Sequence, residues 1–193
     1  ANATTAVGYK ALTALTTGAR NLAVGYRALN AMTDGDDNIA IGFDALLLAD
    51  NSGCDSNIAI GSYAGDAMGD TAIHSTILIG TNAGTAMTHS NCDGDVAIGG
   101  SALASVTNSA GTVAIGTQAG QAITTGNRNT IMGYQALQSA TTQADDNVAI
   151  GYQAMSGAIS TEDVDDCVAI GALALSGALD STDGADEASG TVA

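Results

Sequence analysis

The stretch Asn147-Val-Ala-Ile-Gly151-Tyr-Gln-Ala-Met155 is one copy of a motif that recurs along the whole chain. Near copies of its first five residues start at Asn21, Asn38 and Asn57. Self-similarity at a nearly fixed period indicates a repeat architecture, in which each unit packs on its neighbours. The motif glycine stands at ten positions, 17 to 20 residues apart, which are Gly8, Gly25, Gly42, Gly61, Gly80, Gly99, Gly116, Gly133, Gly151 and Gly171.

The residues before each glycine predict a short β-strand. The residue directly before it is Val, Ile or Met in every unit, and the residue two positions earlier is Leu, Ile, Val or Thr, so both lie on one face of an extended segment. The position between them is Ala except at Leu78 and Ile131. We predict that the residue before glycine belongs to the core and that the strand is buried on both faces.

The residues after each glycine predict a helical stretch. The third residue is Ala in all ten units, and the fourth is Leu or Met except at Gly65, Gly84 and Gly120. Apolar residues at the third, fourth and seventh positions mark one face of a helix. We therefore predict about two helical turns in each unit, weakened where glycine intervenes, and then a polar return loop.

These elements predict a repeat solenoid over residues 1–179, with ten coils of 17 to 20 residues. Each coil contributes one short β-strand and one short helical stretch, and the parallel strands stack at about 4.8 Å. Residues 180–193 lack the motif and are predicted to form a polar cap or linker. The asparagines that open five units are expected to form a hydrogen-bonded ladder, and they are Asn21, Asn38, Asn57, Asn129 and Asn147.

Composition excludes several classes of protein. The 193 residues include 20 acidic and 4 basic ones, and the formal net charge is −16. Such a charge repels phosphate backbones and anionic lipids, so we expect no nucleic-acid partner. No stretch approaches the roughly 20 apolar residues of a membrane span, and no charged-then-apolar leader is present, so membrane insertion is not expected.

The cysteines indicate neither a zinc site nor a complete disulfide framework. Cys54, Cys92 and Cys167 are odd in number and contain no C-x-x-C pair. Cys54 and Cys92 occupy equivalent positions two units apart, which the strand spacing places about 9.6 Å from each other, too far for a disulfide. We expect thiols or a link between chains.

Acidic loops supply candidate calcium ligands, because calcium takes six to eight oxygens from carboxylates and loop carbonyls. None of the loops matches an EF-hand, and a solvated acidic turn is the alternative interpretation. No other cofactor is expected. The candidates are Asp34, Asp36 and Asp37 in one loop, Asp93 and Asp95 in another, and Asp163, Asp165 and Asp166 in a third.

The aromatic and histidine residues offer two further candidate sites. A row of aromatic residues, each directly after a motif glycine, is a candidate glycan-binding surface, or alternatively a packing strip. His74 and His89 have no recurring nucleophile beside them, so catalysis is not expected and we interpret both as solvated surface residues. A zinc site from His89 and Cys92 lacks further ligands. The aromatic row consists of Tyr9, Tyr26, Tyr134 and Tyr152, together with Phe43.

Units such as Asn129-Thr-Ile-Met-Gly-Tyr-Gln-Ala-Leu137 resemble the N-T-A-[IV]-G-Y-x-A-L repeats of phage tail-fibre-like proteins, over essentially the whole chain. The resemblance implies a parallel homotrimer on a virion or cell surface. The Asn-x-Ala-Ile-Gly core is also similar, more weakly, to the head repeats of trimeric autotransporter adhesins, whose period is shorter.

We therefore expect a non-catalytic structural shaft or spacer of an extracellular or virion fibre, with copies of itself as partners. One alternative is an adhesin or fibre segment that binds a cell-surface receptor or glycan. Another is a subunit of a self-assembling extracellular filament. An ice-binding surface is not expected, because threonine occupies the strand columns only at Thr5 and Thr130.

Overall fold

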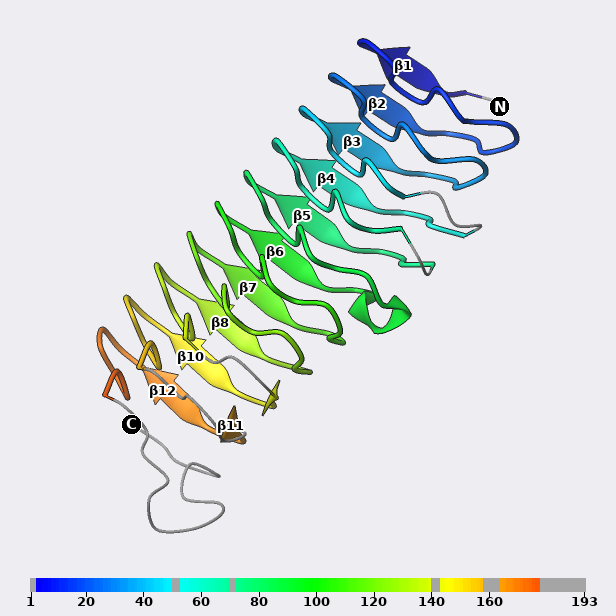
Figure 1. Ribbon diagram of the computed structural model, residues 1–193. Helices are drawn as coiled ribbons and strands as arrows, with labels where there is room; N and C mark the ends of the chain where they lie inside the picture. Colours follow the sequence, from blue (N-terminus) through cyan, green and yellow to red (C-terminus); the bar gives the residue numbers. More distant parts are fainter. Residues whose placement is uncertain (1–2, 50–52, 70–71, 140–142, 158–163, 178–193) are drawn as a thin grey trace.

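The computed structural model describes residues 3–49, 53–69, 72–139, 143–157 and 164–177, and it is a parallel β-solenoid (Figure 1). Successive coils stack along one axis, and each places a strand beside that of the preceding coil. The ten strands of the main sheet are β1 (Thr5–Val7), β2 (Leu22–Val24), β3 (Ile39–Ile41), β4 (Ile58–Ile60), β5 (Ile77–Ile79), β6 (Val96–Ile98), β7 (Val113–Ile115), β8 (Thr130–Met132), β10 (Val148–Ile150) and β12 (Val168–Ile170). A second sheet pairs β9 (Ala144–Asp145) with β11 (Val164–Asp165).

The strands pair in the register that the motif predicts. Ala23 lies beside Ala40, and Ala40 lies beside Ala59, although the first pair is separated by 17 residues and the second by 19. The extra residues therefore lie in the loops. The predicted solenoid with one parallel strand per unit is confirmed, and the predicted cap or linker at 180–193 lies outside the described residues.

The prediction that the residue before glycine is core is wrong. In β3, the central Ala40 is fully buried, whereas Ile39 and Ile41 point outward and are only half-buried. The same pattern holds in the other inner strands, and Ile60 reaches 37% exposure. Each coil closes over one side of the sheet, so the small central residue faces the interior. The large β-branched residues form an outer face that this chain leaves uncovered.

The predicted helical stretches are also absent. The only helix among the described residues is the short 3₁₀ helix η1 (Ser90–Cys92). After each glycine the chain makes tight turns, and two positions have left-handed backbone, as Arg27 at φ 51° and Leu29 at φ 50° illustrate. An α-helix cannot contain such residues. The Leu29 N–H instead donates to the carbonyl of Ala45 in the next coil at 3.0 Å.

The motif glycines make the close stacking of coils possible. All ten have φ between +131° and +146°, a region that other residues rarely adopt. In nine of them, a Cβ atom would lie 2.1 to 2.4 Å from the carbonyl oxygen of the glycine in the next coil. Both the backbone conformation and the contact between coils therefore require glycine.

Candidate functional site

A ladder of polar side chains runs inside the solenoid beside the main sheet, and it confirms the predicted asparagine stack. The Asn21 Oδ1 atom accepts from the Asn38 N–H at 2.9 Å, and Asn38 Oδ1 accepts from the Asn57 N–H at 3.0 Å. The Asn38 side-chain amide donates to the Cys54 carbonyl at 2.7 Å. Thr76 continues the ladder from Asn57. Each buried amide therefore fixes the spacing of two coils.

Asp95 occupies the asparagine position of the β6 unit and is fully buried. Its Oδ1 accepts from the Thr112 N–H at 2.8 Å, and its Oδ2 accepts from the Ser109 hydroxyl. Its own N–H donates to the Cys92 carbonyl of the same coil at 3.3 Å, rather than to Thr76. Burial raises the pKa of Asp95 to about 6, against the hydrogen bonds from Ser109 and Thr112.

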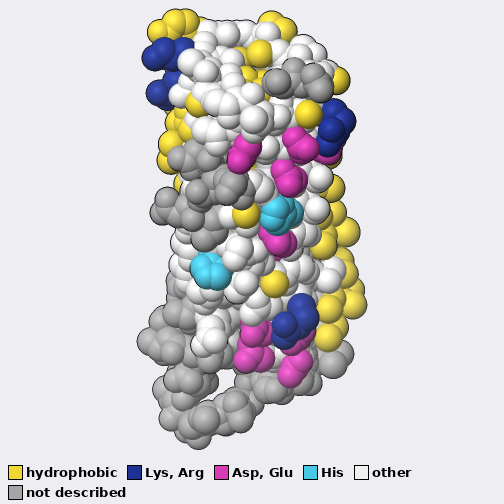
Figure 2. Space-filling model, turned by 90° about the vertical axis from the view of Figure 1, so that its right-hand side faces the viewer, with side chains coloured by type: hydrophobic (Ala, Val, Ile, Leu, Met, Phe, Trp, Pro, Cys, Tyr) yellow, Lys and Arg dark blue, Asp and Glu magenta, His cyan; other side chains and the backbone are white. Residues whose placement is uncertain are grey.

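A second ladder lies on the surface, two residues before each unit-opening position. The Asp36 Oδ1 accepts from the Ala19 N–H at 2.7 Å, and Asp55 Oδ1 accepts from the Asp36 N–H at 2.7 Å. Asp93 accepts from the His74 N–H at 2.7 Å. Figure 2 shows acidic and histidine side chains on this side of the rod, with a column of hydrophobic side chains along its right-hand edge. These carboxylates bind backbone N–H groups of the preceding coil.

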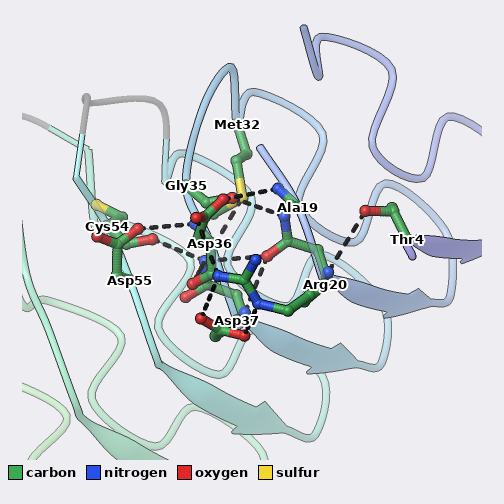
Figure 3. Close-up of polar contacts among 11 residues, drawn as sticks. Thr4, Ala19, Arg20, Met32, Gly35, Asp36, Asp37, Cys54 and Asp55 are labelled. Atoms are coloured by element: carbon green, nitrogen blue, oxygen red, sulfur yellow. Dashed lines mark hydrogen bonds and ion pairs between the residues drawn. The ribbon is translucent and has the colours of Figure 1, made fainter. Parts of the chain in front are cut away.

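Several predicted calcium ligands have such structural roles. Asp36 and Asp37 surround the Arg20 guanidinium, with Asp37 Oδ1 at 2.6 Å from Arg20 Nε (Figure 3). Asp165 accepts from the Asp145 N–H at 2.9 Å.

The remaining candidates are scattered. Asp34 accepts from the Thr33 hydroxyl at 3.4 Å, Asp166 is exposed, and Asp163 lies outside the described residues. The described ranges contain no group of three or more His, Cys, Asp and Glu side chains that could hold a metal ion. Calcium binding stays a prediction.

The arginines form ion pairs between adjacent coils. Hydrogen bonding to Asp37 and the charges of Asp37 and Asp36 raise the pKa of Arg20, and the Arg20 hydrogen bond lowers the pKa of Asp37. Arg128 and Asp146 form an equivalent exposed pair, which shifts their pKa values in the same directions. The pair between Arg27 and Asp44 differs because the Asp44 side chain is only 3% exposed.

We expect Arg27→Ala to destabilise the chain more than Arg128→Ala. Loss of Arg27 leaves the Asp44 carboxylate buried without its cation, whereas Asp146 is 40% exposed and is solvated by water in either case. Urea denaturation of the two variants measures the difference. A clear drop in the midpoint for Arg27→Ala and almost none for Arg128→Ala is the expected result, and equal midpoints would contradict it.

The predicted aromatic row is real, and its rings stack on one another. Tyr9 and Tyr26 have ring centroids 5.2 Å apart, and Tyr26 and Phe43 are 5.0 Å apart with an interplanar angle of 6°. Tyr134 and Tyr152 form a separate stack at 5.7 Å. Tyr26 stacks on Tyr9 on one side and on Phe43 on the other, so both faces of its ring are covered. This geometry favours a packing strip over sugar stacking, although glycan binding itself stays a prediction.

One aromatic residue of the row is not predicted by the motif. Tyr63 lies one position beyond the aromatic column, yet its ring meets Phe43 edge-on at 5.3 Å and extends the row. Ser62 occupies the column position in that unit, and a Tyr directly after it was the available signal.

The histidines accept hydrogen bonds from the backbone, and the cysteines are buried. His89 caps η1, with its Nδ1 accepting from the Asn91 N–H at 3.2 Å, and His74 Nδ1 accepts from the Asp55 N–H at 3.4 Å. All three cysteines are buried, and none of them forms a disulfide within the described part of the chain. Burial raises the pKa of the Cys92 thiol, so it is a poor nucleophile and a poor metal ligand.

Comparisons with family models, curated proteins and solved structures found no match to this chain. Over the described ranges, no helix is long and apolar enough to cross a membrane. Every buried side-chain nitrogen and oxygen in those ranges has a hydrogen-bond partner. The most distinctive features of the molecule are therefore its ladders and its uncovered outer face.

Proposed function

We propose that this chain is a non-catalytic structural shaft or spacer segment of an extracellular or virion fibre. In a solenoid, each unit contacts only its neighbours, so the number of units sets the length of the rod. Ten strands at about 4.8 Å give a stack about 43 Å long between the first and last strands. A part of this kind supplies length and stiffness.

The observation that carries the proposal is that the same positions bond to each other from coil to coil. Backbone pairing joins neighbouring strands, the internal asparagine ladder joins Asn21 to Asn38 and Asn57, and the surface ladder joins Asp36 to Asp55. On the turn side of the coil, the Leu29 N–H donates to the Ala45 carbonyl of the next coil at 3.0 Å, so bending or twisting the rod strains contacts on more than one side of it.

The resemblance to phage tail-fibre-like repeats supports an extracellular or virion location and a parallel homotrimer. A self-assembling filament would need the same stiffness, but its subunits would join end to end without closing into a trimer. The adhesin alternative has less support, because the aromatic rings that were candidates for sugar binding stack on each other.

Light scattering combined with negative-stain imaging tests this function. We expect the mass of three chains of 18.8 kDa and a straight rod. Open-ended polymers would indicate the filament instead. Flexible or globular particles would contradict a shaft of any kind, whatever their mass.

A further inference from the structure

We propose that the outer face of the main sheet is covered by further copies of this chain, aligned parallel and in register, so that the two rims of the face meet at the same coil. The outer face consists of the first and last residues of the ten main strands. This inference rests on the proposed fibre function and names its contact surface.

The outer face is uncharged and aliphatic. Its twenty residues are Ile, Val, Leu, Thr and Met, in a chain whose formal net charge is −16. Met132 is 44% exposed and Ile170 is 60% exposed, and the other outer-face residues of the inner strands are only partly covered by their neighbours in the sheet. A continuous apolar face of this kind, left uncovered by the rest of the chain, marks an interaction surface.

A second copy of the chain is the occupant that fits this face. Two solenoids with the same rise per coil stay in register along their whole length. A surface of another kind has no reason to repeat at this spacing. The negative charge opposes anionic membranes and nucleic acids. The aliphatic columns alone cover a footprint of about 500 Å², whereas a standard interface takes about 800 Å² from each partner. The rims of the face must therefore contribute.

The first rim is the residue directly before each unit-opening position. It is exposed in every described unit. In the units of β4 to β7 it is Ser or Gly, as Ser75 and Gly94 illustrate. In the units of β2, β3, β8 and β10 it is charged, and these residues are Arg20, Asp37, Arg128 and Asp146.

The second rim is the residue directly after each motif glycine, and its size changes in step with that of the first. It is Ser, Thr or Gly in the units of β4 to β7, as Thr81 and Gly100 illustrate. The end units depart from this match, with Ala3 and Tyr9 in one and Asp166 and Ala172 in the other. In the four units that have a charged first rim it is aromatic and exposed, namely Tyr26, Phe43, Tyr134 and Tyr152.

The match explains the parallel orientation. When identical faces surround a common axis in parallel, the first rim of one copy meets the second rim of the next at the same coil. A tyrosine hydroxyl both accepts and donates, so Tyr134 can accept from Arg128, and Tyr152 can donate to Asp146. Tyr134 is 46% exposed and Tyr152 is 52% exposed, so both side chains are open to a partner. An antiparallel pair would bring like rims together.

Charge placed on the outer face tests the surface. Ile79→Lys puts a cation at its centre, and Thr13→Lys adds the same charge at an exposed turn position away from the strands. We expect the wild type and Thr13→Lys to have the mass of an assembly, and Ile79→Lys to have the mass of one chain with an unchanged circular dichroism spectrum. A folded Ile79→Lys that keeps the assembly mass would overturn the surface and leave the shaft function standing.

Cross-linking tests register and orientation. The double variant Ser56→Cys/Ser62→Cys places one thiol on each rim of the β4 unit, and a short thiol cross-linker cannot span the face within one chain. We expect covalent multimers from it and none from Ser56→Cys/Thr117→Cys, whose rim positions are three units apart. The native cysteines are buried and should not interfere. Linkage in Ser56→Cys/Gly111→Cys but not in Ser56→Cys/Ser62→Cys would indicate antiparallel pairing and overturn the proposal.

Discussion

Replacement of Gly80 by Ala is expected to destabilise the repeat stack strongly. The Gly80 backbone has φ +138°, and a Cβ atom there would lie 2.4 Å from the Gly99 carbonyl oxygen, which is backbone and cannot rotate away. Backbone strain costs about 1–3 kcal/mol and overpacking about the same again, so the loss is about 4 kcal/mol. That is a large share of the 5–15 kcal/mol that stabilises a typical domain.

Two other glycines separate the contributions to this loss. Gly171 has nearly the same backbone, with φ +131°, but an added Cβ atom there meets nothing within 4 Å. Gly171→Ala should therefore cost only the backbone strain. Gly94 has φ +76° and also has open space, so Gly94→Ala should cost about 1 kcal/mol. Urea denaturation followed by circular dichroism orders the three variants, and a Gly80→Ala protein as stable as Gly171→Ala would refute the stacking argument.

The sequence predicts the strand part of the fold well because the motif is strict there. A pair of mostly β-branched residues and a glycine at nearly constant spacing determine strand position and parallel register, and the Asn that opens five of the units predicts the internal ladder. Ala23, Ala40 and Ala59 lie side by side, as their place in the motif requires.

The sequence predicts helices where the structure has turns, because a helix and this turn bury apolar residues at the same spacing. The fourth residue after glycine is buried in both, and only the backbone differs. Gly65, Gly84 and Gly120 carried the missing signal, since they stand at that position with φ of +59° to +60°. Glycine in place of Leu is expected at a left-handed turn position and is unfavourable inside a helix.

The interior side of the strand could also have been inferred from paired changes. Leu78 stands where most units have Ala, and the glycines at Gly65 and Gly84 leave room for it, because a Cβ atom on either would lie within 2.8 Å of the Leu78 side chain. Ile131 and Gly120 show the same exchange. Large and small residues that exchange in this way face each other across a core, so the central strand residue points inward. The outer face follows from this by alternation.

A second large effect is expected at Asp95, where Asp95→Asn should stabilise the protein at neutral pH. Asparagine is the residue that the internal ladder uses at this position in five units, and it carries no charge to desolvate. Its Oδ1 can still accept from the Thr112 N–H. A carboxyl whose pKa is raised from 3.8 to about 6 by burial costs about 3 kcal/mol when ionised in the fold.

The pH dependence at Asp95 has a definite sign. The folded state holds the proton up to about pH 6, whereas the unfolded chain loses it near 3.8. Between these values the folded state binds more protons, so the contribution of Asp95 to stability falls as pH rises, and above about pH 6 the full cost remains. The difference between Asp95→Asn and the wild type should therefore grow from pH 4 to pH 6 and then stay constant. Urea denaturation at several pH values measures it, and a difference that does not change with pH would contradict the argument.

Ser109→Ala provides the matching test, because the Ser109 hydroxyl donates to Asp95 Oδ2 and lowers the pKa that burial raises. Without this donor, the ionised carboxylate is less well solvated and the neutral acid is little affected. Ser109→Ala should therefore destabilise the protein more at pH 8 than at pH 4, which is opposite in sign to the effect of Asp95→Asn at pH 8. When Ser109→Ala is added to Asp95→Asn, its effect should be the same at pH 4 and pH 8, because the pH dependence arises from the Asp95 carboxyl alone. Over the described part of the chain, the internal ladder is interrupted only between Thr76 and Asp95, and the buried Asp95 carboxyl favours its protonated form, so mild acid should strengthen the rod at this junction.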